Sequence, residues 1–298
     1  MKKHRYLFCF TILLIGTSAL SQARIQKSFL VCGDSKVLLI DYEGSRDTIP
    51  KVSWNWDAHS AKDIPEEYRL KKFNSMDDCK PDHNGERVLV ASSSGAIAII
   101  EKKTRKVMFY ANVPMAHSIE MLPSGFVAAA ASTAGGGNRI MLFNINKSDE
   151  LLFSDSLYSG HGVVWDKNRE SLFALGYDVL REYKLVTKGK ARLTLQHEWE
   201  LPHKGGHDLQ MAPGGNDLFL TIEKAGAWEF NLKTSEFGRI KGFTGAPIIK
   251  SIGKNDAGQF IYTVPEESWW TYHVKFSNPN RSFAFPGMHV YKARWFSK

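Results

Sequence analysis

The stretch Ser159-Gly-His161-Gly-Val-Val-Trp-Asp166 decides the fold, because related stretches recur at nearly constant spacing. Gly206-His207-Asp-Leu-Gln-Met211 follows it and Ala116-His117-Ser-Ile-Glu-Met121 precedes it, with the three histidines 44 and 46 residues apart. In each repeat the histidine opens a short apolar strand, which is followed by a turn, a second apolar strand and a third strand. Self-similarity with this period is typical of a β-propeller, in which each repeat forms one four-stranded blade.

The third strand of each repeat carries a polar residue beside apolar ones, and this signature predicts six repeats. It occurs at Ile40-Asp41-Tyr42, Ile100-Glu101-Lys102, Phe143-Asn144-Ile145, Tyr183-Lys184-Leu185, Phe230-Asn231-Leu232 and Val274-Lys275-Phe276. The first repeat lacks an opening strand, whereas residues 288–295 resemble an opening strand with nothing after it. We therefore expect an all-β fold over residues 24–298: a single six-bladed β-propeller, closed by a C-terminal strand that joins the N-terminal blade.

Residues 1–23 are expected to be a cleavable signal peptide. They combine a basic start (Lys2, Lys3 and Arg5) with an apolar run from Leu7 to Ile15 and a small-residue end at Ala23. The apolar run is too short to cross a bilayer, and no later segment approaches the roughly 20 apolar residues that crossing requires. The sequence therefore predicts an exported protein, periplasmic or extracellular, without a transmembrane segment.

The charge and the cysteine content of the chain limit which classes of ligand and which cysteine states are compatible with the sequence. The formal net charge is +8, and three of the positive charges lie in the predicted signal peptide. A mildly positive chain suits an anionic ligand, and an exported protein without a basic run is a poor candidate for nucleic-acid binding. Cys32 and Cys79 lie in apolar strands of adjoining repeats, where they form either a disulfide or two free buried thiols.

Residues at the start of the innermost strands are expected to converge on the axis of the propeller. They are Asp77 or Lys80, His117, His161, His207, Lys250 and His289. Three interpretations stay open. The histidines are buried structural groups, as in WD40 repeats, although the tryptophan partner of those repeats is missing here. Alternatively they hold a divalent metal ion, or they form an acid–base and anion-binding cluster with Lys250.

One connection breaks the regular repeat. The third-strand signatures at Asp41 and Glu101 are 60 residues apart, where the other neighbours are 40 to 47 apart. The surplus carries Trp54, Trp56 and His59. Because it joins an outermost strand to the next innermost strand, we expect it on the face of the recurrent histidines, where it would help to form a pocket.

Loops between second and third strands are expected to complete a rim on the same face. They contribute Glu223, Trp269 and Trp270, and Asp77 and Lys80 lie at the adjoining strand starts. Aromatic platforms beside polar groups suit sugar rings, whose faces are apolar and whose edges form hydrogen bonds. These residues are therefore predicted to bind substrate.

The layout resembles that of secreted bacterial six-bladed β-propellers of uncharacterised function with WD40-like repeats, over the whole mature chain. More distantly, the axial cluster is similar to that of oligogalacturonate lyases, which hold manganese through histidines and a glutamine and cleave uronic-acid glycosides by β-elimination. This second resemblance implies that His117, His161, His207 and His289 bind a divalent metal (Mn, Zn or Ca), without an organic cofactor. It also implies an acidic glycan or oligosaccharide as substrate, with Lys250 or His289 as the catalytic base.

Two classes of function follow from the sequence. The first is a metal-assisted enzyme, either a polysaccharide or oligosaccharide lyase or another glycoside-cleaving enzyme. The second is a non-catalytic propeller that binds a glycan or a partner protein on the same face.

Overall fold

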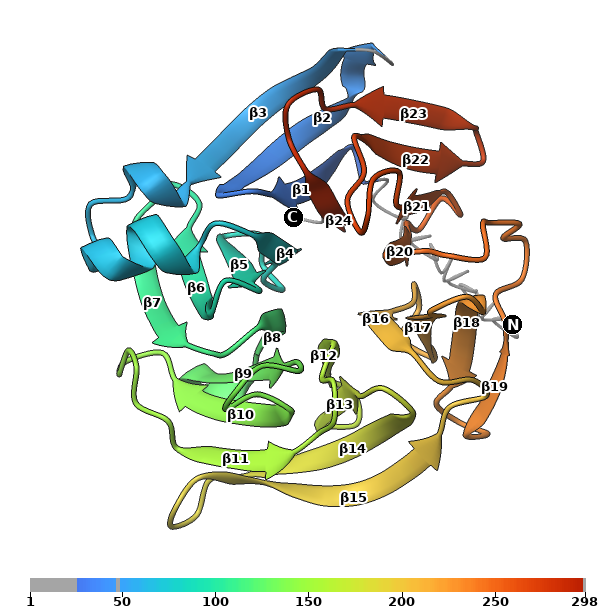
Figure 1. Ribbon diagram of the computed structural model, residues 1–298. Helices are drawn as coiled ribbons and strands as arrows, with labels where there is room; N and C mark the ends of the chain where they lie inside the picture. The colour runs from blue at the N-terminus through green and yellow to red at the C-terminus, as the bar shows by residue number, and fades with distance from the viewer. Residues whose placement is uncertain (1–25, 47–48, 297–298) are drawn as a thin grey trace, which may run out of the picture.

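The computed structural model describes residues 26–46 and 49–296 and shows the predicted all-β architecture, a ring of six blades around a central axis (Figure 1). Each blade is a four-stranded antiparallel sheet whose innermost strand borders the axis. The predicted signal peptide, residues 1–23, lies outside the described residues. No helix in the described part of the chain is long and apolar enough to span a bilayer.

The first blade contains strands from both ends of the chain. From the axis outward it consists of β24 (Val290–Phe296), β1 (Ser28–Gly33), β2 (Lys36–Arg46) and β3 (Ile49–Asp57). β24 pairs antiparallel with β1, with Phe29 opposite Trp295 and Val31 opposite Ala293. The predicted closure of the ring by the C-terminal strand is therefore confirmed, and Figure 1 shows β24 beside β1 in this blade.

The other five blades follow one another along the chain, and each begins with its innermost strand. The second blade consists of β4 (Met76–Pro81), β5 (Arg87–Ser92), β6 (Ala96–Glu101) and β7 (Val107–Asn112), and the third of β8 (Ala116–Met121), β9 (Phe126–Ala131), β10 (Arg139–Asn144) and β11 (Phe153–Ser156). The fourth blade consists of β12 (Gly162–Asp166), β13 (Ser171–Leu175), β14 (Val179–Val186) and β15 (Arg192–Glu200), and the fifth of β16 (Gly206–Met211), β17 (Asp217–Ile222), β18 (Gly226–Asn231) and β19 (Glu236–Arg239). The sixth blade consists of β20 (Ser251–Lys254), β21 (Phe260–Thr263), β22 (His273–Ser277) and β23 (Arg281–Ala284). A short helical turn, η3 (Pro123–Gly125), joins β8 to β9.

The hydrophobic core lies between the blades, so both faces of the inner strands are buried. All six residues of β9 are buried. Val127 and Ala129 pack with residues of the second blade, whereas Ala128 and Ala130 pack with residues of the fourth. Burial on both faces explains why these strands read as continuous apolar runs instead of alternating with polar residues.

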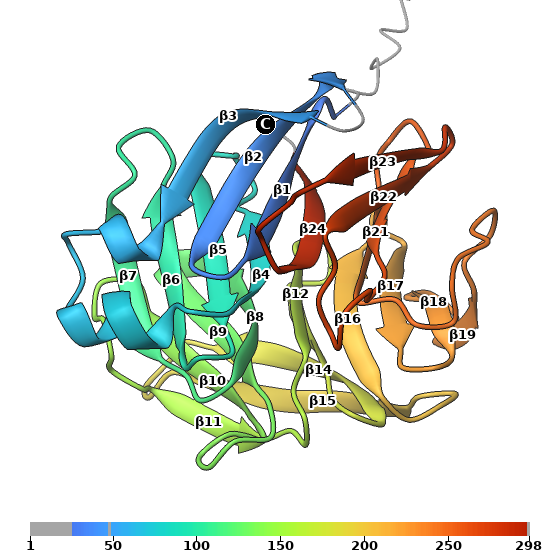
Figure 2. The same ribbon diagram turned by 45° about the horizontal axis from the view of Figure 1, so that its top comes forward.

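The long connection after β3 emerges on the predicted face. It contains two helical turns, η1 (Ala58–Ser60) and η2 (Tyr68–Lys72), and leads into β4. β3 ends and β4 begins on the face where every innermost strand begins, because Lys36 at the start of β2 pairs with Asp57 at the end of β3. Both turns lie at the outer edge of the ring, beside the first two blades (Figure 2).

The two cysteines outside the predicted signal peptide are free thiols. Cys32 lies in β1 and Cys79 in β4, and both are buried. Of the two alternatives open from the sequence, the structure shows the pair of buried thiols.

Ring closure yields a direct test. A chain that ends at Pro286 lacks β24, so it exposes the cores of the first and last blades and should lose several kcal/mol of a total stability of about 5–15 kcal/mol. We expect it to melt far below the full-length protein, or without a cooperative transition, when followed by circular dichroism.

Complementation provides the control for the truncated chain. A synthetic peptide covering residues 287–298 should restore the transition if the missing strand is the cause. A truncated chain that melts within a few degrees of the full-length protein would contradict this account of closure.

Candidate functional site

Six side chains, one from each blade, occupy the axis on the face where the innermost strands begin. We call them the axial hexad: Asp77, His117, His161, His207, Lys250 and Tyr291. The ring centroids of His117 and His161 are 4.2 Å apart, and those of His161 and His207 are 4.7 Å apart. All hexad side chains except that of His161 are less than one-tenth exposed. The predicted convergence of Asp77, Lys250 and these three histidines on the axis is therefore what the structure shows.

A recurrent β-bulge explains why these side chains turn toward the axis. In the pairing of β8 with β9, the register shifts between Ala116 and Ser118, so His117 is the extra residue. Asp77 and His207 occupy the same position in β4 and β16, and Tyr291 does so in β24. A bulge redirects the side chain of its extra residue, and here it directs it away from the blade interfaces.

His289 is not a member of the hexad, which corrects the prediction that it would converge with the other histidines. Its side chain is 48% exposed, and its Nδ1 lies 2.9 Å from Asp34 Oδ1 at the rim. The bulge in β24 places Tyr291, two residues later, at the axis. Sequence reasoning missed Tyr291 because it aligned this strand on its histidine, and the bulge position of β24 carries a tyrosine instead.

A second sequence signal would have found Tyr291. The residue after each hexad member is polar or glycine, since it begins the polar lining of the channel. These residues are Asp78, Ser118, Gly162, Asp208, Ser251 and Lys292. Glycine is required in the fourth blade, because a Cβ on Gly162 would lie 2.4 Å from Cβ of Leu209 in β16. Alignment on this polar position selects Tyr291 over His289.

Directly below the hexad, a buried ion cluster fills the channel between the innermost strands. We call it the axial plug: Asp78, Lys80, Asp208, Lys292 and Arg294. The guanidinium of Arg294 donates to both carboxylates, at 2.9 Å to Asp78 Oδ1 and at 2.8 Å to Asp208 Oδ2. Lys292 Nζ lies 3.2 Å from Asp208 Oδ1, and Lys80 Nζ lies 3.5 Å from Asp78 Oδ2. Charged side chains therefore occupy the space that appears open between the ribbons in Figure 1.

The plug places Lys80 below the hexad and not in it. Lys80 Nζ donates to Ser118 Oγ at 3.0 Å and to the carbonyl oxygen of Val163 at 2.6 Å. Of the two residues that the sequence allowed at this position, Asp77 is the hexad member. Glu120 Oε2 lies 3.7 Å from Lys80 Nζ. Together with Asp78 and Asp208, Glu120 provides three carboxylates that face the three cations of the plug.

Opposite charges in the plug stabilise one another across the blades. Burial alone would raise the pKa of Asp78, but the charges of Arg294, Lys80 and Lys292 outweigh burial and hold this pKa well below its ordinary value. Burial also acts to raise the pKa of Asp208, and the cations Arg294 and Lys292 lower it overall. Both carboxylates are thus ionised at neutral pH although they are fully enclosed.

The histidines of the hexad are held in defined orientations. Nδ1 of His117 lies 3.0 Å from the carbonyl oxygen of Met115, and Nδ1 of His161 lies 2.8 Å from that of Ser159. A carbonyl only accepts, so Nδ1 of each ring carries the proton and Nε2 keeps its lone pair. Burial lowers the pKa of His161 to about 4 and that of His117 well below its ordinary value. Both imidazoles are therefore neutral at pH 7.

His207 is joined to the two non-histidine donors of the hexad. Lys250 Nζ lies 2.6 Å from His207 Nε2, and the Tyr291 hydroxyl lies 3.2 Å from the same nitrogen. Burial, reinforced by His161 and Lys250, lowers the pKa of His207 well below its ordinary value. Burial also lowers the pKa of Lys250. A lysine with a lowered pKa beside a neutral imidazole is a common feature of sites that transfer protons.

The pKa of Asp77 is shifted upward, whereas the pKa values of the plug carboxylates Asp78 and Asp208 are shifted downward. Burial raises its pKa to about 7, and the amide of Ser93, which donates to Oδ2 at 2.5 Å, offsets only part of this effect. The hexad thus contains a carboxyl group and an amine whose pKa values both move toward neutrality.

The predicted rim is partly assembled around the hexad. The ring of Trp270 lies 5.5 Å from that of Tyr291 and 6.2 Å from that of His289. Glu223 is exposed, and its charge acts on Lys250 by raising the pKa of the amine against the effect of burial. Trp269 is 60% exposed at the surface. Trp270 and Glu223 are thus placed beside the hexad, whereas Trp269 faces solvent.

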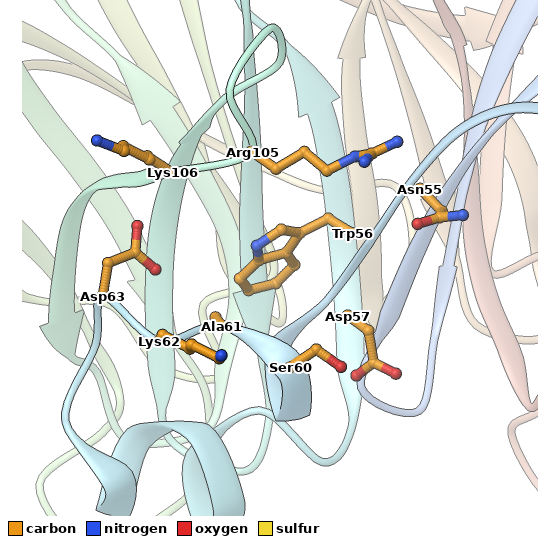
Figure 3. Close-up of a pocket in the computed structure, with 9 residues that line it drawn as sticks. All are labelled: Asn55, Trp56, Asp57, Ser60, Ala61, Lys62, Asp63, Arg105 and Lys106. Carbon is orange, nitrogen blue, oxygen red and sulfur yellow. The ribbon is translucent and has the colours of Figure 1, made fainter.

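Trp54, Trp56 and His59 do not share the axial site, which corrects the prediction that they would line it. Both tryptophans lie in β3, the outermost strand of the first blade, and are buried in the core between the first and second blades. Trp54 Nε1 donates to the carbonyl oxygen of Lys102 at 2.8 Å. His59 is exposed beside Asn74. The surplus residues thus cover an interface between blades, and Trp56 borders a separate pocket there (Figure 3).

A metal ion would have to compete with the lysine for the third histidine. Nε2 of His117 and of His161 are suited to ligation, because a hydrogen bond from Nδ1 to a backbone carbonyl is the usual support of a metal-bound imidazole. Nε2 of His207 is instead engaged by Lys250. In residues 26–46 and 49–296, no group of three or more His, Cys, Asp or Glu side chains is arranged to hold a metal ion.

Fold and site together define a class: a closed six-bladed β-propeller with a cluster of titratable side chains on its axis, above a buried ion cluster. The chain belongs to a family of unknown function, DUF6528, whose model matches residues 26–298. The expected membership of an uncharacterised propeller family is thereby confirmed. No curated protein matches the sequence.

The plug predicts a large cost for removing its central cation. Arg294→Met leaves Asp78 and Asp208 buried without their shared partner, so we expect a loss of about 3–5 kcal/mol in the free energy of unfolding. Denaturant titration measures this loss. Arg239→Met, which removes an exposed guanidinium stacked on Trp228, is the control and should cost no more than ~1 kcal/mol. Equal losses in the two variants would contradict the role of the plug.

The raised pKa of Asp77 predicts a pH dependence of stability. Near pH 3 and below, Asp77 is mostly protonated in both the folded and the unfolded state, and its full contribution to stability is present. This contribution is lost as pH rises from about 4 through about 7. Asp77→Asn keeps an acceptor for the Ser93 amide, so it should match the wild type near pH 3 and exceed it by ~2–4 kcal/mol at pH 8. Parallel stability curves for the two proteins would refute the raised pKa.

Proposed function

We propose that the axial hexad is a site of proton transfer on an acidic carbohydrate, as in a lyase that removes the proton next to a carboxylate. The supporting observation is the contact of Lys250 Nζ with His207 Nε2 at 2.6 Å, with the Tyr291 hydroxyl 3.2 Å from the same nitrogen. This arrangement favours the acid–base and anion-binding interpretation over a three-histidine metal site.

The preference for an anion follows from the charges on the axis. Among the described residues, Lys250 has no carboxylate within ion-pair distance, whereas each lysine and arginine of the plug has one. Proton transfer to Lys250 would create a buried cation without a carboxylate partner, which is costly, and the carboxylate of a bound substrate would lower this cost. The rim adds Trp270 as an aromatic platform for a sugar ring.

Each hexad member then has a chemical role in the proposal. Lys250, with its lowered pKa, takes the proton next to the carboxylate, and the Tyr291 hydroxyl donates to the leaving oxygen. His207 orients both groups through its Nε2. His117 and His161 offer neutral Nε2 acceptors to substrate hydroxyls. If a divalent ion binds, the same two nitrogens would be its ligands and the ion would polarise the carboxylate.

A second candidate is a non-catalytic propeller that binds a glycan or a partner protein on this face. The burial of the hexad supports this second candidate. Among the described residues, His161 is the only hexad member that is not buried, so little of the hexad is exposed to a substrate. In both proposals the ligand lies outside the cytoplasm, as the predicted signal peptide requires.

Turnover of oligouronates tests the proposal. β-Elimination creates a carbon–carbon double bond conjugated to the carboxylate, so the product is followed by ultraviolet absorbance. We expect activity in the wild type and a loss of about 10²–10⁴-fold in kcat for Lys250→Met, because a general base typically contributes this much. Lys204→Met, an exposed change on the neighbouring connection, is the control and should retain activity.

Three other results separate the alternatives. Oligouronate binding without a new absorbance supports the non-catalytic propeller. Stoichiometric metal in the purified protein, with activity lost on chelation, supports the metal-assisted form. Activity of Lys250→Met equal to that of the wild type contradicts the proposed base.

A further inference from the structure

A pocket lies on the outside of the ring, at the junction of the first and second blades. Its volume is about 460 Å³. Trp56 of β3 borders it, together with Lys62 and Asp63 after η1 and with Arg105 and Lys106 of the turn between β6 and β7 (Figure 3). We call it the Trp56 pocket. It shares no lining residue with the axial hexad.

The indole of Trp56 has an unused hydrogen-bond donor. The residue is only 4% exposed, and its Nε1 has no hydrogen-bond partner among the described residues. The neighbouring Trp54 is satisfied, because its Nε1 donates to the carbonyl oxygen of Lys102. Buried donors without an acceptor are rare in proteins, so this group calls for an explanation. Figure 3 shows the indole ring among the lining side chains, with its nitrogen on the side of Asp63 and Lys106.

Three cationic side chains and two carboxylates, Asp57 and Asp63, line the pocket, and this excess of positive charge favours an anionic ligand. Lys62, Arg105 and Lys106 are exposed, and within the described residues none of them has a carboxylate at ion-pair distance. Asp63 is the acidic group on the nitrogen side of the indole, and one of its oxygens accepts from the backbone amide of Val107 at 2.6 Å. Its other oxygen can accept from a ligand hydroxyl.

We propose that the Trp56 pocket binds a sugar residue that carries a carboxylate or a sulfate. A ring or hydroxyl oxygen of the sugar accepts from Trp56 Nε1, and a hydroxyl donates to Asp63. The anionic group pairs with Arg105, Lys62 or Lys106. The indole N–H and the charged side chains around it supply the hydrogen-bonding partners that the hydroxyl-rich edge of a sugar requires.

Access to the indole nitrogen requires a side chain to move. Nε1 is closed to solvent, so an acceptor reaches it only when an exposed neighbour such as Arg105 or Lys106 rotates. Long exposed side chains without ion-pair partners change rotamer readily. The pocket therefore binds its ligand by a local side-chain rearrangement, independently of the axial site.

The test uses the two adjacent tryptophans as a matched pair. Indole ¹⁵N–¹H spectra of the full-length protein are recorded during titration with D-glucuronate, D-glucose 6-sulfate and D-glucose. We expect the Trp56 signal, assigned from its absence in Trp56→Phe, to shift saturably with the two anionic sugars. D-Glucose should bind about tenfold more weakly, since it lacks the charged group.

The variants assign the effect to the unused donor. Trp56→Phe should weaken D-glucuronate binding by about tenfold in calorimetry, because it removes one hydrogen bond to the ligand. Trp54→Phe should bind as the wild type does. Arg105→Gln, an exposed change that leaves the core intact, should weaken both anionic sugars and thus tests the pocket even if Trp56→Phe fails to fold.

Two results would overturn the proposal: a Trp56 signal that none of the sugars shifts, or equal affinity of Trp56→Phe, Arg105→Gln and the wild type. Lys250→Met should leave the shift of the Trp56 signal unchanged. A loss of that shift in Lys250→Met would assign the binding to the axial hexad instead. A preference between the two anionic sugars identifies the charged group that the pocket takes.

Discussion

The contact of Arg294 with Asp78 and Asp208 holds the centre of the propeller together. These residues come from three different innermost strands, β24, β4 and β16, which are far apart in the chain. An unpaired charge at this depth would cost several kcal/mol, so the carboxylates keep Arg294, and with it the C-terminal strand, at the axis. Ring closure and channel filling thus depend on the same residues.

The plug also sets the conditions for the hexad above it. It closes the channel on one side, so a ligand reaches the hexad from the face where the innermost strands begin. Lys292 links the plug to the hexad. Its Nζ donates to the carbonyl oxygen of His117 at 3.3 Å and also pairs with Asp208 of the plug. Its positive charge is one reason why the pKa values of the hexad imidazoles are low. The result is a densely packed cluster of titratable groups whose imidazoles are neutral.

The sequence predicted the ring, its closure and four hexad members, and it left Asp77 and Lys80 as alternatives for a fifth, because repeats impose their period on every blade. His117, His161 and His207 were visible since each blade places the equivalent residue at the same depth. Tyr291 was not visible, because this blade carries a tyrosine at the bulge position while a histidine, His289, stands two residues earlier. The outward position of Trp54 and Trp56 was also missed, since aromatic residues in an inserted segment suit a binding rim and an interface between blades equally well.

The proposed proton transfer depends on the contact between Lys250 and His207. The most direct measurement is ¹⁵N NMR of the imidazole nitrogens of His207 as a function of pH. We predict a neutral ring at pH 7, with Nε2 unprotonated and accepting from Lys250. An imidazolium at neutral pH, or a ring with its proton on Nε2, would contradict the proposed site.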